Sequence, residues 1–171
     1  MGGIIPHQEI IRRNRETALF DVFSETKQVV NGKSWGVSQA GYDVRIAQDV
    51  TLYPVTLPSL ALELFGIRRD SFKLASTVEY FYMPNDLIAR VADKSTWARL
   101  GLAVQNTVIE PGWQGYLTLE LTNHSRDVIR IQKGEPIAQI IFEQLTEATE
   151  QPYSGKYQYQ ENRPVDAILE K

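Results

Sequence analysis

A carboxylate stands in the middle of one of the most apolar stretches of the chain. Glu120 lies between two leucines in the segment YLTLELT, residues 116–122. Successive side chains of a strand point to opposite faces, so Glu120 would share one face with Thr118 and Thr122. The leucines of the segment would share the other face: Leu117, Leu119 and Leu121. The face of Glu120 is either a solvent-exposed polar stripe, because glutamate is seldom fully buried, or the floor of a pocket that tunes the pKa of a general base. Spacing alone leaves both interpretations open.

A second group of polar residues opens a short predicted helix, residues 94–101, with the sequence KSTWARLG. It offers two cations and two hydroxyls: Lys94, Arg99, Ser95 and Thr96. Helix N-terminal amides together with such side chains suit an oxyanion such as a phosphate. The alternative is an ordinary capped helix on the surface, with solvated charges.

Two further segments carry candidate binding residues. In IEPGWQG, residues 109–115, a Pro-Gly turn precedes Trp113, which is either a packed aromatic residue or a platform for a ribose or a base. In PYSGKYQYQ, residues 152–160, tyrosine, lysine and glutamine are interleaved. This segment is either a disordered tail or a lid that brings Lys156 onto a substrate anion.

Composition limits the classes of function. A chain of 171 residues is expected to form a single domain, residues 1–171. The formal net charge of -3 argues against broad binding to nucleic acid, but it leaves room for a local pocket for a small anion. The sequence has no cysteine, so it predicts neither disulfides nor thiolate metal sites, as is usual in the cytoplasm. No stretch approaches the roughly 18 apolar residues of a membrane span. We expect a soluble cytoplasmic protein that binds neither nucleic acid nor membrane.

The elements that must position these residues are mostly short strands. Residues 6–15 predict a short helix, and Asn31-Gly32 predicts a turn. From about residue 72 onward, short β-rich segments alternate with turn residues, which is typical of an all-β barrel or sandwich. The polar segment from about residue 146 to 171 lacks core periodicity and predicts a loosely attached C-terminal arm or lid.

Together the motifs resemble the dCTP deaminase branch of the trimeric dUTPase-like superfamily. The resemblance runs from about residue 36 to 160, through GYDVRI, KSTWARLGL, IEPGWQGYLTLELTN, PIAQIIFEQL and PYSGKYQYQ. It implies a distorted β-barrel or jelly-roll-like fold with a few short helices. It also implies a homotrimer with active sites at subunit interfaces, and hydrolysis of dCTP to dUTP and ammonia, which supplies dUTP for thymidylate synthesis.

The resemblance also implies a role for each candidate residue. Glu120 would take a proton from a water molecule that attacks C4 of the cytosine, with Ser95 and Arg99 holding the water and neighbouring groups. Arg99 would also place a positive charge near Glu120. The remaining matched positions would bind the nucleotide: Lys94 and Thr96 near the phosphates, Glu110 near the 3′-hydroxyl, Trp113 near sugar and base, Thr107 and Val108 in the loop that senses the pyrimidine, and Tyr153, Lys156 and Gln160 in the arm.

The resemblance implies Mg²⁺ that accompanies the triphosphate, and no zinc. Zinc-dependent nucleobase deaminases use a His/Cys/Cys or Cys₃ site, and this sequence has no cysteine. The resemblance also implies that dTTP is a candidate inhibitor, as in many relatives.

The sequence departs from the family pattern in two places. The loop of residues 104–111 is two residues shorter than in many relatives, a form that some relatives share, so it does not predict loss of activity. Ala98 stands where forms that continue to dUMP often have glycine, which favours a deaminase that stops at dUTP. The alternatives are a bifunctional enzyme that yields dUMP, a dUTP pyrophosphatase, and a catalytically silent nucleotide-sensing module. Glu120 favours the deaminase, because neither a simple dUTPase nor a silent binder needs a carboxylate there.

Overall fold

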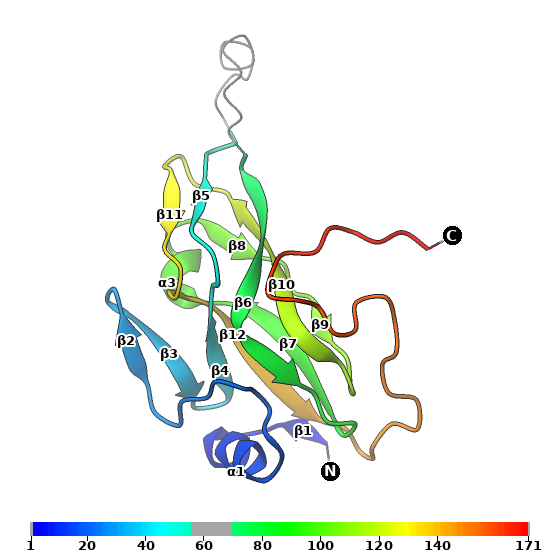
Figure 1. The fold of residues 1–171 in the computed structure, drawn as a ribbon. Coiled ribbons are helices and arrows are strands. Elements are labelled where there is room, and N and C mark those ends of the chain that lie inside the picture. The colour runs from blue at the N-terminus through cyan, green and yellow to red at the C-terminus, as the bar shows by residue number, and fades with distance from the viewer. Residues whose placement is uncertain (1, 56–69, 171) are drawn as a thin grey trace.

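Strands form most of the regular structure, as the sequence predicted. The computed structural model describes residues 2–55 and 70–170. Within these residues it contains twelve strands, labelled in Figure 1, and two helices: α1 (His7–Thr17) and α3 (Ser95–Ala98). The expectation of a mainly β protein with short helices is therefore confirmed.

Three sheets make up the body of the molecule. The largest has the order β2-β3-β4-β12-β7-β9, with β1 also paired to β12. Its strands are β1 (Gly3–Ile4), β2 (Gln28–Val30), β3 (Lys33–Ser38), β4 (Gly41–Arg45), β7 (Leu87–Asp93), β9 (Val108–Ile109) and β12 (Pro136–Gln144). The second sheet has the order β6-β10-β8, with β6 (Phe72–Tyr82), β8 (Leu102–Val104) and β10 (Gln114–Asn123). The third pairs β5 (Val50–Leu52) with β11 (Ile129–Ile131). The strands surround the core without closing into a barrel among the described residues.

The core is built where the alternating apolar faces of the strands meet. Along β7 the buried side chains are those of alternate residues, Leu87, Ala89 and Val91, as expected of a strand with one face on the core. An aromatic cluster lies beside them, in which the ring of Phe20 is 4.8 Å from that of Phe81 in a T-shaped arrangement. Packing in the core therefore fixes the register of the strands. The register in turn decides which side chains lie on the face of each strand that points away from the core.

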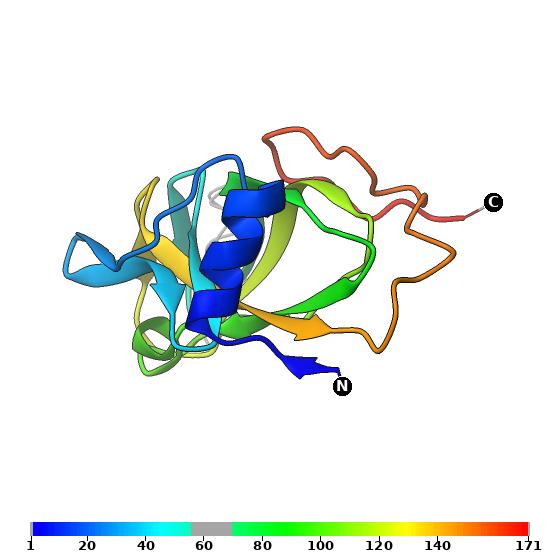
Figure 2. The ribbon, with the colours of Figure 1, turned by 90° about the horizontal axis from the view of Figure 1, so that it is seen from below.

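Helix α1 lies across one end of the molecule, as Figure 2 shows. It begins after Pro6, as the sequence predicted, because proline fits the start of a helix and has no amide hydrogen to leave unpaired. Ile10 is fully buried against the core, whereas Arg12, Arg15 and Glu16 of the helix are exposed. The helix extends two residues beyond the predicted end at residue 15.

Tight turns set the strand connections. Asn31 and Gly32 both have positive φ, 49° and 73°, and they join β2 to β3 as predicted. Gly112 has φ 81° in the turn between β9 and β10. Gly101, with φ 88°, follows the short helix α3, as expected of a glycine at a helix end.

The C-terminal arm runs beside β10 (Figure 1) and is attached to it by backbone hydrogen bonds. The amide of Tyr116 donates to the carbonyl of Gln160 at 3.0 Å, and the amide of Tyr159 donates to the carbonyl of Gln114 at 2.8 Å. Gly115 forms a parallel bridge with Gln160, and a Cβ there would lie 2.8 Å from the Gln160 nitrogen. The close approach therefore requires glycine at this position. The arm is more firmly bonded than the polar composition of its sequence predicted.

Candidate active site

A cavity of about 590 Å³ lies over β6 and β10, beneath the C-terminal arm. Phe72 and Leu74 of β6 line one part, and β10 contributes Leu117, Thr118 and Glu120. The remaining lining comes from residues 107–110, from Trp113 and from the arm. The walls are largely apolar, so a carboxylate inside the cavity meets less water than one on the surface.

Glu120 is the carboxylate on the β10 side of this cavity. Its side chain is partly buried, and its Oε2 atom is buried without a hydrogen-bond partner among residues 2–55 and 70–170. Burial raises the pKa of Glu120, because desolvation disfavours the charged form. Such a group is suited to accept and return a proton near neutral pH.

Leu117 differs from the sequence expectation. It was expected to face away from Glu120 with Leu119 and Leu121, but it lines the cavity that Glu120 lines. The pairing of β10 with β6 shifts register between Tyr116 and Thr118, so Leu117 lies at an irregularity in the strand. Between these two pairs, one residue of β10 faces three residues of β6, so the regular alternation of side chains is interrupted there.

The loop after β8 contains Thr107, which lines the cavity and carries a second buried polar atom without a partner among the described residues. The amide of Thr107 donates to the carbonyl of Gln105 at 2.9 Å, which makes a tight turn. The amide of Gln105 in turn donates to the carbonyl of Glu120 at 3.0 Å. The Oγ1 atom of Thr107 is buried and has no partner within the described part of the chain. Val108 also lines the cavity, and it is 48% exposed.

The turn between β9 and β10 holds Trp113 in place. Its ring is buried against Phe81, and its Nε1 donates to the carbonyl of Tyr157 in the arm at 2.7 Å. Trp113 is thus both a packed aromatic residue and part of the cavity wall. Glu110 lines the same cavity and is exposed.

The arm brings two of its three predicted residues to the cavity. Tyr153 and Gln160 both line it, and the amide of Tyr153 donates to the carbonyl of Pro111 at 2.8 Å. Lys156 lies outside the lining, and its Nζ is 3.5 Å from Glu170 Oε1.

The four residues around α3 lie elsewhere. Figure 1 shows α3 on the opposite side of the molecule from the arm, and none of these residues lines the cavity: Lys94, Ser95, Thr96 and Arg99. The last three are exposed, whereas Lys94 is buried and donates to Asp43 Oδ2 at 2.9 Å. Within one chain, therefore, Arg99 does not supply the positive charge that was expected beside Glu120.

Sequence reasoning missed several residues of both regions. Phe72 and Leu74 share a face of β6 opposite β10, a spacing of two that could have been noticed. Val165 and Asp166 line the cavity from a segment without any periodic pattern. Asp43, which also pairs with Lys27, carried no signal beyond its place in an alternating strand.

No cluster of three or more histidine, cysteine, aspartate or glutamate side chains that could hold a metal ion occurs among the described residues. In that same part of the chain, no helix is long and apolar enough to cross a membrane.

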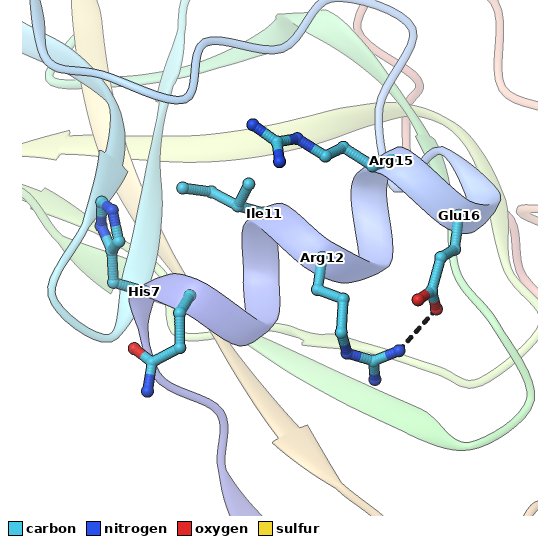
Figure 3. A pocket seen from close by; sticks show the side chains of 6 residues that line it. His7, Ile11, Arg12, Arg15 and Glu16 are labelled. Carbon is cyan, nitrogen blue, oxygen red and sulfur yellow. Dashed lines mark hydrogen bonds and ion pairs between the residues drawn. The ribbon is translucent and has the colours of Figure 1, made fainter.

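A shallower hollow over α1 is unrelated to the predicted residues. Figure 3 shows His7, Ile11, Arg12 and Arg15 around it, on the exposed side of the helix. Arg12 is engaged by Glu16 and by Glu9, so its charge is already compensated.

Comparisons with known proteins place the chain in a family. A dCTP deaminase-like family model matches residues 4–145. A dCTP deaminase of Gemmatimonas aurantiaca is 35% identical over 92% of this chain and 95% of its own length. One of Campylobacter hominis is 32% identical over 98% of this chain and 97% of its own. The chain belongs to the dCTP deaminase family.

Solved structures agree with this assignment at the level of fold. A 2′-deoxycytidine 5′-triphosphate deaminase from Agrobacterium tumefaciens has a TM-score of 0.56 and 21% identity, over 84% of this chain and 49% of that one. Native EIAV dUTPase has a TM-score of 0.50 and 22% identity, over 70% of this chain and 87% of that one. The dUTPase-like fold expected for this member of the dCTP deaminase family is confirmed.

Proposed function

We propose that this protein hydrolyses dCTP to dUTP and ammonia, with Glu120 as the residue that moves protons. The observation that carries the proposal is a half-buried carboxylate, with one oxygen unpaired among the described residues, in a cavity of nucleoside size. Membership of the dCTP deaminase family supplies the substrate class.

The proposed reaction begins with a water molecule beside Glu120. The carboxylate takes one proton as the water oxygen bonds to C4 of cytosine, and it gives that proton to N3. It then takes the second proton, from the new hydroxyl on C4, and gives it to the departing amino group. The C4–N bond then breaks, and ammonia leaves. One water is consumed for each dCTP, and Glu120 ends in its starting state.

The cavity walls would hold the nucleoside. Trp113 and Leu117 offer flat and apolar surfaces for sugar and base, and Glu110 is proposed to accept a hydrogen bond from the 3′-hydroxyl. Thr107 and Val108 would contact the pyrimidine. Because both lie in the loop bonded to the Glu120 carbonyl, they sit close to the proton acceptor.

The polar residues in and beside α3 would come from a second copy. Ser95 and Arg99 are exposed and outside the cavity of their own chain, so a homotrimer with sites at its interfaces would let one subunit complete the site of its neighbour. Thr96 of that neighbour would face the phosphates, together with Lys156 of the arm. Lys94, which pairs with Asp43 in the single chain, would lie behind them and add positive charge. Mg²⁺ would enter with the triphosphate as part of the substrate. Inhibition by dTTP and a cytoplasmic location belong to the same proposal.

Product analysis tests this function. The purified protein is incubated with dCTP and Mg²⁺, and dUTP, dUMP, pyrophosphate and ammonia are resolved. Ammonia with dUTP is the expected result. Ammonia with dUMP and pyrophosphate would indicate the bifunctional enzyme, and no turnover of dCTP would overturn the proposal.

A further inference from the structure

The hydroxyl of Thr118 is bonded on both sides to the C-terminal arm. It donates to Gln160 Oε1 at 2.9 Å and accepts a hydrogen bond from the amide of Val165 at 3.1 Å. A hydroxyl has one donor hydrogen and lone pairs to accept, so the two bonds are compatible. We propose that Thr118 is a positioning residue that latches the arm over the Glu120 cavity; the inference rests on the proposed function of that cavity.

Thr118 is well placed for this role. It is buried, it lies two residues before Glu120 in β10, and it lines the same cavity. The first part of the arm is bonded independently, through the backbone of Tyr116 and through Trp113 Nε1. The latch therefore acts mainly on the segment after Gln160.

That terminal segment has few other attachments to the strands. Within the described part of the chain, two hydrogen bonds join residues 161–170 to the sheet. The amide of Val165 donates to Thr118 Oγ1, and the hydroxyl of Ser76 donates to Asn162 Oδ1. The amide of Ile168 donates to the Tyr157 hydroxyl, which belongs to the arm itself. Loss of the Thr118 hydroxyl would thus remove one of two ties.

The latch shapes the cavity through the residues that follow it. Val165, Asp166 and Ala167 form part of the cavity lining, directly after the amide that Thr118 holds. If this wall lifts away, water enters beside Glu120, and its carboxylate is solvated again. Thr118 would thereby control how much water reaches the Glu120 carboxylate, without touching the reacting atoms.

Two substitutions separate the hydroxyl from the volume of the side chain. Thr118→Val keeps the branched shape and removes both hydrogen bonds, whereas Thr118→Ser keeps the hydroxyl. Thr122→Val is the matched control, because Thr122 lies on the same strand and is absent from the cavity lining. Hydrogen–deuterium exchange of peptides from residues 161–170 is measured in the full-length protein.

We expect amides of the terminal segment in Thr118→Val to exchange about tenfold faster, a shift that corresponds to the loss of roughly one hydrogen bond. Thr118→Ser and Thr122→Val should exchange as the unmodified protein does. Equal exchange in Thr118→Val and the unmodified protein, or equal acceleration in Thr122→Val, would overturn the latch.

The pH profile of kcat/KM gives a second readout that a purely structural role would not move. Proton acceptance requires ionised Glu120, so activity falls as pH drops below its pKa, which burial raises. The other titratable groups lining the cavity are Glu110, Tyr153, Tyr157 and Asp166. Water that enters in Thr118→Val lowers the pKa of Glu120, so the acidic limb should shift to lower pH and KM for dCTP should rise. An acidic limb at the same pH would contradict this effect.

The two hypotheses fail in different ways. If the unmodified protein does not turn over dCTP, the proposed function falls, and the exchange experiment still decides whether Thr118 holds the arm. If dCTP is turned over and the exchange of Thr118→Val is unchanged, the function stands and the latch falls.

Discussion

The cavity around Glu120 and the face around α3 place their charged groups in opposite surroundings, one partly buried and the other exposed to solvent. In the cavity, a lone carboxylate is partly withdrawn from water by apolar walls, and its pKa is raised. At α3, Ser95 and Arg99 are exposed to solvent. A proton acceptor gains from a dry surrounding, whereas a binding surface for a triphosphate gains from accessible positive charge.

The difference is also visible in how each region pairs its charges. Asp43 is one buried carboxylate that serves two lysines, Lys27 and Lys94. The single charge of Asp43 therefore balances only one of its two lysine partners. Glu120 has no cation partner within residues 2–55 and 70–170, so the cavity carries an excess of negative charge. The proposed site at a subunit interface would bring Arg99 of one chain beside the unpaired carboxylate of the next.

The largest effect should come from Glu120→Gln. The change keeps size and shape and removes the basic oxygen, so kcat for dCTP should fall by about 10²–10⁴-fold, the usual contribution of general acid–base catalysis. Binding of dCTP should stay within about tenfold, because the walls are unchanged. Single-turnover kinetics and calorimetric titration with dCTP measure the two quantities.

The stability of the same variant separates catalysis from folding. Glutamine needs no solvation of a charge in the cavity, so its free energy of unfolding at neutral pH should equal or exceed that of the unmodified protein. Glu143→Gln is the control, since Glu143 is exposed on β12 and pairs with Arg90 outside the cavity. Joint loss of stability and dCTP binding in Glu120→Gln would assign Glu120 a structural role.

A subunit-mixing experiment tests whether the two regions meet across an interface. Chains carrying Glu120→Gln and chains carrying Arg99→Ala are co-expressed with different tags, and assemblies holding both tags are purified. Every mixed cyclic trimer contains one junction that pairs an intact Glu120 with an intact Arg99. Doubly tagged assemblies should therefore recover about one third of the unmodified rate, whereas each variant alone is nearly inactive.

A different recovery would refute that geometry. If both residues acted within one chain, no mixed assembly would contain an intact site, and the rate would remain at the level of the single variants. Measurement of mass in solution, by light scattering, checks that the assemblies are trimers before rates are compared.

Much of the fold follows from local sequence rules. Strand alternation and turn chemistry predicted β7 and the Asn31-Gly32 turn, because each depends on residues close together in the chain. The helix predicted over residues 94–101 is shorter in the structure, where α3 ends at Ala98. Leu117 could not be placed correctly in this way. Its orientation depends on a register shift against β6, and a partner strand some 40 residues away leaves no local trace.

The candidate site was only partly predictable for a related reason. The motif around Glu120 was visible as a carboxylate in an apolar strand, and the cavity residues of the 107–113 segment followed from the resemblance. The contribution of Val165 and Asp166 to the cavity could not be predicted. These residues lie in a segment with no periodicity and are held by a hydrogen bond to Thr118. Likewise, the pairing of Lys94 with Asp43 is a long-range contact that no spacing rule contains.

The smallest effect, and the one that sharpens the account of the cavity, should come from Thr107→Val. The Thr107 hydroxyl is buried and unpartnered within the described chain, so its removal should raise the free energy of unfolding by about 1 kcal/mol. If the hydroxyl is held ready for the nucleotide, KM for dCTP should rise by roughly twofold to tenfold at the same time, the equivalent of one hydrogen bond. Denaturant unfolding and steady-state kinetics measure the two effects, and Thr107→Ser, which keeps the hydroxyl, is the control.

A stabilised variant with unchanged KM would show that the hydroxyl does not meet the substrate. A destabilised variant would show that the Thr107 hydroxyl already has a hydrogen-bond partner, either water or a residue of a second subunit. In the second case this loop, like α3, would belong to the part of the site that two subunits share.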